Sequence, residues 1–303
     1  MTQVRRVKRP VDGVLLLDKP YDVSSNGALQ KARGLFQAAK AGHTGVLDPL
    51  ATGLLPVCFG EATKFSAYLL DADKAYRATV HFGRTTTTGD IEGEVLRERP
   101  IAFDRAALEA ALAAMVGEIE QVPPMYSALK HQGKALYEYA RAGVEIERAP
   151  RRVTIYALTL QSFDGVEAVV DVLCSKGTYV RTLAEDLGEA LGAGAHLTGL
   201  RRTASAGFSL DAAVTLEQIE ALDLAGRDAL LLAPDVLVQH LPAVSLDDEQ
   251  SRRFSHGQAV RIDEKCETML RFRVYRQESR KFLGLAEALD GAVLQPVRLM
   301  AAT

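Results

Sequence analysis

The chain has 303 residues, 48% of them hydrophobic and 25% charged, which is typical of a soluble globular protein with a large and a small domain. Its net charge of −3 excludes a uniformly basic surface, so binding of a polyanion would depend on local basic patches. The apolar runs are far below bilayer length and no signal-peptide core is present, so we expect a cytoplasmic protein without membrane association. The three scattered cysteines, Cys58, Cys174 and Cys266, argue against a disulfide framework and a zinc site.

Apolar periodicity and turn residues divide the chain into alternating strands and helices. In chain order, the predicted elements are a buried strand at 13–17, a helix from Ser24 to about Lys40, a half-buried strand at 75–82, a polar loop at 83–93, a helix at 103–116, an antiparallel pair of strands at 153–160 and 166–173, a helix at 183–191, a loop at 192–199 and a strand from 200. Residues 178–181 resume the strand pattern before the helix, so Tyr179 and Arg181 are expected to share one face of a strand.

Three further segments differ in composition from this core. A basic tail covers residues 1–10, and an excursion at 124–152 carries six basic and three acidic residues with tyrosines among them. Aromatic and cationic side chains together suit RNA bases and phosphates, and they equally suit a small tyrosine-rich subdomain. After a helical linker, residues 242–303 predict a small β domain with turns at 256–257, 284 and 290–291.

Residues 41–53 read AGHTGVLDPLATG and have neither a helical nor a strand period, so they predict a structured loop. Asp48 precedes a proline, which disfavours the α region for it and holds it in an extended or turn geometry. A carboxylate fixed in this way is a candidate nucleophile or general base. The alternative is an ordinary turn, because Asp-Pro and glycine are common turn residues.

Known cofactor and nucleophile motifs are absent from the sequence. The six histidines form no HxxxH or HExxH pattern, and no Walker A, GxGxxG or GxSxG motif occurs. The class of reaction that remains uses one carboxylate and needs neither a metal nor a cofactor. Arg181 would keep such a carboxylate ionised, and Tyr76 and Tyr179 would form a slot for a flat base, although core tyrosines and a surface ion pair are the simpler interpretations.

Five segments resemble the TruB family, the bacterial tRNA pseudouridine-55 synthases. They are GVLLLDKP at 13–20, AGHTGVLDPLATG at 41–53, GEATK at 60–64, MYSALK at 125–130 and CSKGTYVRTL at 174–183. The resemblance runs from about residue 11 to 210, and the tail resembles a PUA-type RNA-binding domain. It implies an α+β pseudouridine synthase fold with a central mixed, largely antiparallel sheet over 11–241, an insertion at about 124–152, and a PUA-like β domain at 242–303.

The resemblance also implies a function and site residues. Such a protein isomerises one uridine of the tRNA T loop, position 55, to pseudouridine without metal or cofactor. It would act as a monomer on tRNA, with no protein partner implied. By resemblance, Asp48 is the nucleophile and pairs with Arg181. Tyr76 stacks on the base and takes part in the C5 proton transfer, and Tyr179 and Leu200 line the uracil pocket. His43 lies against the position in the loop from which the nucleotide has flipped out, and Lys19, Lys64 and Asp90 contact substrate.

Departures from the family pattern and alternatives remain. The family usually shows Thr-Asp-Thr after Gly83, but this chain has three threonines at 86–88, so the acid expected at Thr87 is missing. One alternative is a tRNA-binding or tRNA-folding module with secondary catalysis, and another is a pseudouridine synthase for a different RNA site. The order of the chemical steps stays open.

Overall fold

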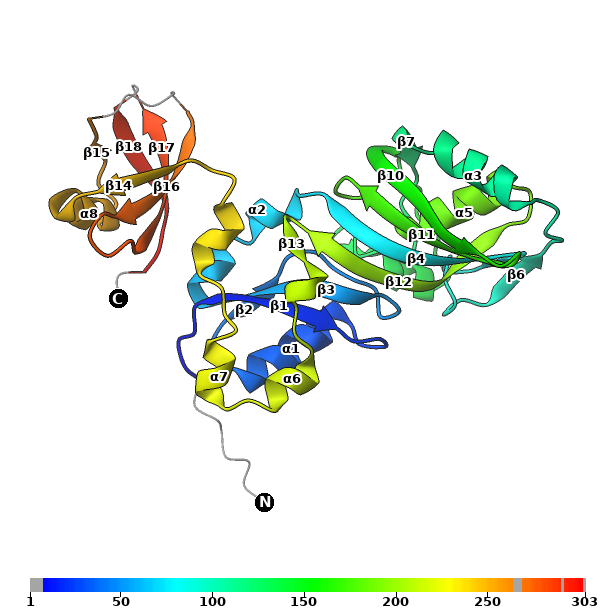
Figure 1. Cartoon of the computed structure of the whole chain (residues 1–303), viewed down its shortest axis with the longest axis horizontal. Coiled ribbons are helices and arrows are strands. Elements are labelled where there is room, and N and C mark those ends of the chain that lie inside the picture. Colours follow the sequence, from blue (N-terminus) through cyan, green and yellow to red (C-terminus); the bar gives the residue numbers. More distant parts are fainter. Residues whose placement is uncertain (1–7, 264–268, 290–291, 302–303) are drawn as a thin grey trace, which may run out of the picture.

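The computed structural model describes residues 8–263, 269–289 and 292–301. A nine-stranded mixed sheet forms the larger part of the molecule, and a five-stranded sheet forms the smaller part (Figure 1). Along the large sheet the strands are β1 (Gly13–Lys19), β3 (Thr52–Phe59), β12 (Ala195–Ser205), β4 (Lys74–Phe82), β11 (Glu167–Cys174), β10 (Arg151–Phe163) and β7 (Gly117–Gln121), with β2 (Ala41–His43) beside β3 and β13 (Phe208–Ser209) beside β12. Only the β3–β12 contact is parallel among the described pairs of this sheet, so the predicted mixed, largely antiparallel sheet is confirmed.

Helices cover this sheet in two groups (Figure 1). The helices are α1 (Ser25–Leu35), α2 (Ala67–Leu70), α3 (Arg105–Ala114), α4 (Leu136–Arg141), α5 (Val180–Ala190), α6 (Leu216–Glu220), α7 (Leu224–Asp228) and α8 (Asp248–Ser255), with 3₁₀ turns η1 (Gly60–Lys64), η2 (Leu210–Ala212) and η3 (Pro234–Val238). Helices α3 and α5 pack on β4, β10 and β11 in one hydrophobic core, and α1 and α6 pack on β1 and β3 in a second. Within the described residues, no helix is long and apolar enough to cross a membrane.

The smaller sheet has the order β14 (Ala243–Leu246), β16 (Arg271–Arg276), β17 (Phe282–Leu289), β18 (Val293–Leu299) and β15 (Val260–Arg261), and α8 packs against it. The predicted turn at 256–257 is present, because His256 ends α8 and Gly257 has a φ of +82°. The turn predicted at Gly284 is wrong, since this glycine lies inside β17. The turn predicted at 290–291 lies outside the described residues.

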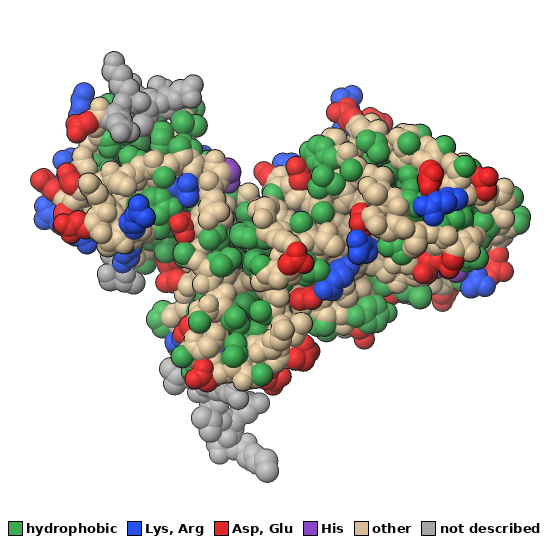
Figure 2. Space-filling model, in the orientation of Figure 1, with side chains coloured by type: hydrophobic (Ala, Val, Ile, Leu, Met, Phe, Trp, Pro, Cys, Tyr) green, Lys and Arg blue, Asp and Glu red, His purple; other side chains and the backbone are tan. Residues whose placement is uncertain are grey.

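Two hairpins stand apart from both sheets. They are β5 (Arg84–Thr86) with β6 (Val95–Glu98), and β8 (Lys130–His131) with β9 (Lys134–Ala135). The first takes up residues 84–86 of the polar loop expected at 83–93 and leaves 87–93 as turns, and the second lies in the 124–152 insertion. Figure 2 shows acidic and basic side chains interspersed on the displayed face, and an open notch between the small sheet and the far end of the large one.

Several predicted boundaries are wrong for local reasons. Helix α1 ends at Leu35 and not near Lys40, because Gln37 adopts a φ of +52°, which a right-handed helix cannot continue. Residues 41–43 and 52–53, predicted as loop, are strand because β2 pairs with β3 and β3 continues along β1 as far as Gly53. Strand β12 starts at Ala195, so the predicted loop at 192–199 is shorter.

The most consequential correction concerns Tyr179 and Arg181. They do not lie on a strand, because β11 ends at Cys174 and a turn through Gly177, with a φ of +82°, leads directly into α5. Tyr179 is the N-cap residue of α5, and Arg181 lies in its first turn. The two side chains therefore reach the same region from a helix terminus and not from one face of a strand.

Candidate active site

The loop between β2 and β3 is held in place from several sides. The Ser25 hydroxyl bridges the backbone of Leu47, 2.7 Å from its N–H and 2.9 Å from its carbonyl oxygen. Leu47 and Leu50 are buried in the core beneath α5, and the Pro49 carbonyl accepts a hydrogen bond from the Asp22 N–H at 3.0 Å. These contacts immobilise the backbone on both sides of Asp48, so its carboxylate is presented in one orientation.

The carboxylate of Asp48 forms an ion pair with Arg181. The distance between Asp48 Oδ2 and Arg181 NH2 is 3.0 Å, and the side chains are 36% and 5% exposed. Arg181 also donates to the carbonyls of Thr88 at 2.9 Å and Tyr126 at 2.6 Å. Burial raises the pKa of Asp48, whereas the charge of Arg181 lowers it and so favours the ionised form. Arg181 therefore both orients the acid and offsets its burial.

This acid opens onto a pocket of about 430 Å³. Five of the nine predicted site residues line it: Asp48, Tyr76, Tyr179, Arg181 and Leu200. Tyr76 extends from β4, and Leu200 lies on the neighbouring β12, opposite Ala78. The volume and the aromatic and aliphatic walls suit a flat heterocycle.

Tyr179 is clamped at the entrance of α5. Its backbone N–H donates to the Gln121 side chain at 3.0 Å, and the buried Gln121 amide donates to its carbonyl at 3.3 Å. The Arg151 guanidinium lies 4.8 Å from the centre of its ring. This arrangement makes the ring one wall of the pocket and leaves a basic side chain at its rim.

Two more predicted residues lie just behind the pocket. Asp90 is 2% exposed, and its Oδ2 lies 3.5 Å from Arg181 NH1, on the other side of the guanidinium from Asp48. His43 lies on β2, where its Nδ1 is buried without a hydrogen-bond partner. Burial and the charge of Arg202 lower the pKa of His43, so the ring is neutral at pH 7.

The two predicted lysines take other positions. The side chain of Lys19 is fully buried and donates to the carbonyls of Val23 at 2.5 Å and Pro49 at 3.3 Å, so it braces the loop that carries Asp48. Burial lowers the pKa of Lys19 to about 8. Lys64 donates to Glu61 at 2.6 Å and to the Leu299 carbonyl at 2.9 Å, which places it at the junction with the small sheet. Neither ammonium group lines the pocket.

Sequence reasoning missed two charged groups around the site. Arg202 is 1% exposed and lines the pocket, and Glu185 lies one helical turn after Arg181 on α5. The sequence carried a signal for the first, because Leu200 and Arg202 are two apart on a strand and share a face. A buried guanidinium without a carboxylate partner costs several kcal/mol of desolvation, which calls for a compensating role.

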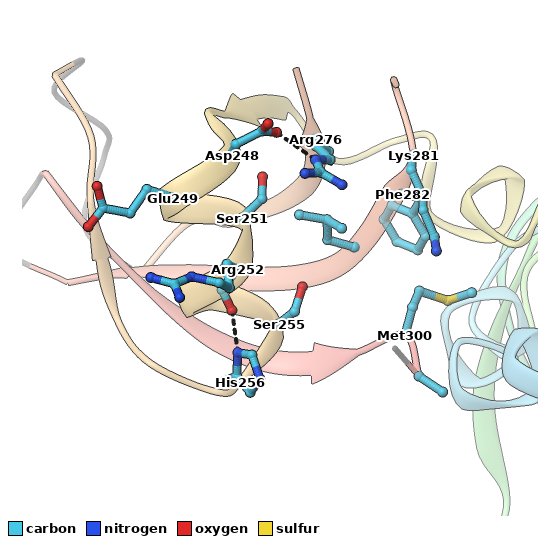
Figure 3. A pocket seen from close by; sticks show the side chains of 12 residues that line it. Asp248, Glu249, Ser251, Arg252, Ser255, His256, Arg276, Lys281, Phe282 and Met300 are labelled. Atoms are coloured by element: carbon cyan, nitrogen blue, oxygen red, sulfur yellow. Dashed lines mark hydrogen bonds and ion pairs between the residues drawn. The ribbon is translucent and has the colours of Figure 1, made fainter. Parts of the chain in front are cut away.

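A second cavity, of about 630 Å³, lies in the small sheet between α8, β16 and the ends of β17 and β18 (Figure 3). Its lining is polar on several sides: Asp248, Glu249, Arg252, His256, Arg276 and Lys281. Asp248 pairs with Arg276 at 2.6 Å. This cavity shares no lining residue with the Asp48 pocket, so it is a separate feature of the molecule.

Comparison with known proteins agrees with this geometry. Residues 33–180 match the profile of the TruB family pseudouridylate synthase (N-terminal domain), residues 181–238 that of the tRNA pseudouridylate synthase B C-terminal domain, and residues 242–300 that of pseudouridine synthase II TruB, C-terminal. The tRNA pseudouridine synthase B of Chromobacterium violaceum is 67% identical over 301 residues, which cover 99% of this chain and 98% of that protein. The protein of the same name from Methylobacillus flagellatus is 56% identical over 298 residues, covering 98% of each.

Among solved structures, a chain of a Cbf5–Nop10–Gar1 complex superposes with a TM-score of 0.70. The identity is 24%, and the alignment covers 95% of this chain and 85% of that one, so this likeness shows the fold. The near-complete matches to family profiles and relatives give the identity of the protein. The chain belongs to the TruB family of pseudouridylate synthases, and it is an enzyme.

Proposed function

We propose that this protein isomerises the uridine at position 55, in the T loop of tRNA, to pseudouridine, with Asp48 as the nucleophile. The relatives named tRNA pseudouridine synthase B support tRNA as the substrate. The observation that carries the assignment of Asp48 is its 3.0 Å ion pair with Arg181 at the wall of a pocket that fits a base. A binding module has no need of an oriented carboxylate in such a place.

The chemistry requires three events. The bond between N1 and C1′ breaks, the uracil turns within the pocket, and C5 forms the new bond to C1′ before it loses its proton. An ionised Asp48 can attack C6 of the base, attack C1′ or deprotonate the sugar. The walls formed by Tyr76, Tyr179 and Leu200 keep the detached base close to C1′, which makes its return effectively intramolecular.

The target uridine must leave the stack of the loop to reach Asp48. Unstacking costs a few kcal/mol, and stacking on an aromatic side chain returns about 1–3 kcal/mol per base. Residues 127–129 of the 124–152 insertion line the pocket, and Arg151 lies at its rim. We assign to this insertion the role of closing over the T arm, where its basic residues face phosphates.

We further propose a division of labour along the chain. Residues 11–241 form the catalytic domain and residues 242–303 a PUA-like domain that contacts a more distant part of the tRNA. The cations around the second cavity, including Arg252, support this assignment. A cytoplasmic monomer that acts on tRNA without a protein partner or a cofactor fits these roles. In this scheme Lys19, Lys64 and Asp90 hold the site and the junction together, and their contact with substrate stays a prediction.

Tritium release tests the function and the nucleophile together. An unmodified tRNA transcript with tritium at C5 of its uridines should lose about one equivalent with the wild type, and a pseudouridine-selective chemical stop should map to position 55. Asp48→Asn should abolish release while tRNA affinity stays within severalfold. The matched control is Asp104→Asn, since Asp104 caps α3 far from the pocket and asparagine caps equally well.

Three results would change the assignment. Turnover by Asp48→Asn would remove the nucleophilic role. Release at another uridine would keep the chemistry and overturn the substrate position. Tight binding by the wild type without any release would favour a tRNA-binding or tRNA-folding module.

A further inference from the structure

Arg202 occupies the middle of the large sheet. It lies on β12 opposite Tyr76 of β4 on one side and opposite Gly53 of β3 on the other. Its side chain is 1% exposed and reaches the pocket of Asp48. Its neighbour Arg201 points to the other face, where it pairs with Asp18 at 2.6 Å and remains 42% exposed. The two arginines therefore have opposite environments within one strand.

The charge of Arg202 has no carboxylate partner among the described residues. Its Nε donates to the Leu54 carbonyl at 2.6 Å, and NH2 lies 3.4 Å from the Gly45 carbonyl. Asp48, the nearest acid of the pocket, is engaged by Arg181. The lowered pKa values of His43 and Lys74 both include a contribution from the positive charge of Arg202. The pocket therefore contains a buried cation whose field is not neutralised at rest.

We propose that Arg202 is a positioning residue for Tyr76, which it holds in the pocket and stabilises as a phenolate while Tyr76 moves a proton between N1 and C5 of the uracil. The cross-strand pairing supports this role, because it sets the guanidinium and the phenol side by side on one face of the sheet. The inference rests on the proposed isomerisation and deepens it. It also gives the unneutralised charge a purpose, since the cation is compensated when the anion forms.

The proton balance is internal to the pocket. When the bond from N1 to C1′ breaks, its electron pair stays on N1, and the Tyr76 hydroxyl gives its proton to that nitrogen. The phenolate so formed lies beside Arg202, which keeps its own proton throughout. The π pair of the C5–C6 double bond then forms the bond from C5 to C1′ and replaces the pair that C1′ lost to N1. The C5–H bond breaks, its proton goes to the phenolate, and its electron pair restores the C5–C6 double bond. Tyr76 ends as it began, and no outside base is consumed.

Three charged or titratable groups face Tyr76 from the elements around it: Arg202 on β12, Cys174 on β11 and Asp48 on the loop before β3. Burial raises the pKa of Tyr76, and Cys174 and Asp48 raise it further. Of these three, only Arg202 lowers it. Lys74, on the same strand as Tyr76, also lines the pocket. Removal of the Arg202 charge should therefore raise the pKa of Tyr76, so that the phenolate forms less readily.

The test compares Arg202→Gln and Arg202→Lys with Arg201→Gln and Arg201→Lys as matched controls. Single-turnover rates are measured on tRNA transcripts that carry hydrogen or deuterium at C5 of uridine. We expect Arg202→Gln to lower the rate by about a hundredfold, as for loss of one general acid–base function. The ratio of the hydrogen to the deuterium rate should rise above that of the wild type, because C5 deprotonation becomes the slow step. Arg202→Lys should recover part of the rate, and the Arg201 variants should behave as the wild type.

A second readout does not depend on activity. Ultraviolet titration of tyrosinate, taken as the difference between each protein and its Tyr76→Phe counterpart, isolates the Tyr76 hydroxyl. We expect its midpoint to move to higher pH in Arg202→Gln. If that variant does not fold, Arg202→Lys carries both measurements, with a smaller shift because the shorter ammonium side chain lies farther from the phenol.

The outcomes separate this inference from the proposed function. A slow variant whose isotope ratio and Tyr76 titration both match the wild type would reduce Arg202 to a structural residue and overturn the inference. A wild-type rate would do the same. If the wild type itself makes no pseudouridine, the proposed function fails, and an unshifted Tyr76 titration would then overturn the pairing of Arg202 with Tyr76 independently.

Discussion

Three carboxylates surround one guanidinium at the base of the pocket. Asp48 and Asp90 lie 3.0 and 3.5 Å from Arg181, and Glu185 lies on the next turn of the same helix. Burial raises the pKa of Glu185 to about 7, and Asp90 is among the acids that raise it further, whereas Arg181 opposes the shift. The positive charge of Arg181 therefore acts on all three carboxyl groups and favours their ionised forms.

Glu185 makes stability depend on pH in a defined direction. In the unfolded chain it loses its proton near 4.5, but in the folded protein only near 7. The folded state thus binds this proton more tightly than the unfolded chain. The contribution of Glu185 to the free energy of unfolding is complete below about pH 4.5 and is lost as the pH rises through 7. When the pH is raised from 5 to 8, the free energy of unfolding of Glu185→Gln in urea should increase by about 2 kcal/mol relative to that of the wild type. Glu109→Gln is the control, because Glu109 forms an exposed ion pair with Arg105 on α3. A constant difference across this range would contradict the assignment.

The buried ammonium group of Lys19 stabilises the backbone around the site through hydrogen bonds to carbonyl oxygens. Its ammonium group donates to carbonyls on both sides of the site, including that of Pro49, the residue after Asp48. Lys19→Met should cost about 3 kcal/mol of unfolding free energy, because the carbonyls lose a charged donor. The exposed Lys31→Met should be near neutral. Equal stability of the two variants would show that the bracing is unimportant.

At the scale of elements, the parallel contact between β3 and β12 joins the two halves of the site. It places Gly53 against Arg202 and so connects the loop of Asp48 to the strand that carries Leu200 and Arg202. The backbones approach so closely that a Cβ on Gly53 would lie 2.4 Å from the Arg202 carbonyl oxygen. Gly53 also has a φ of +97°, which side chains disfavour.

Gly53→Ala should therefore separate these strands. We expect a loss of about 3 kcal/mol in unfolding free energy, together with reduced turnover, because strain and overlap act on backbone that cannot yield. Gly34→Ala in α1 is the control, since beyond the backbone of its own helix no atom lies within 4 Å of the added methyl group, and it should stabilise by up to about 1 kcal/mol. Wild-type stability of Gly53→Ala would mean that the strands can move apart freely.

At the scale of the whole molecule, the two sheets share a hydrophobic core. Phe282 and Leu285 of the small sheet pack with Leu16 and Leu54 of the large one, and Lys64 bonds to the Leu299 carbonyl. Removal of residues 242–303 would expose this core, so a truncation would confuse folding with binding. Surface substitutions are the sharper test of the smaller part.

Arg252→Gln together with Arg253→Gln removes two exposed cations from α8. If residues 242–303 contact tRNA, affinity should fall, and the slope of log affinity against log salt should decrease by about one for each lost phosphate contact. Single-turnover rates at saturating enzyme should stay unchanged, because the pocket is remote. Arg105→Gln with Arg97→Gln, on the larger part, is a charge-matched control. An unchanged slope would count against a tRNA-binding role of this sheet.

Much of this architecture is determined by local sequence. The alternation at 75–82 predicted β4 with Tyr76 on its buried face, and Asp104 was identified as the cap of α3, because both depend only on neighbouring residues. The prediction of the strand pair β10 and β11 is confirmed for the same reason. The motif at 41–53 identified Asp48 as the centre of interest, and the structure places it in the pocket with four other predicted residues.

Long-range contacts decided the remainder. The period-2 pattern at 178–181 failed because the turn at Gly177 and the clamp of Gln121 on Tyr179 start a helix there, and Gln121 is 58 residues away in the chain. The positions of Lys64 and Arg202 depend on partners more than 100 residues distant, which no local pattern reveals. The sequence by itself identified Asp48, Tyr76, Tyr179, Arg181 and Leu200 as site candidates and located most of the strands and helices. Only the tertiary structure decided which charges meet, because burial and pairing arise when distant strands are brought into register.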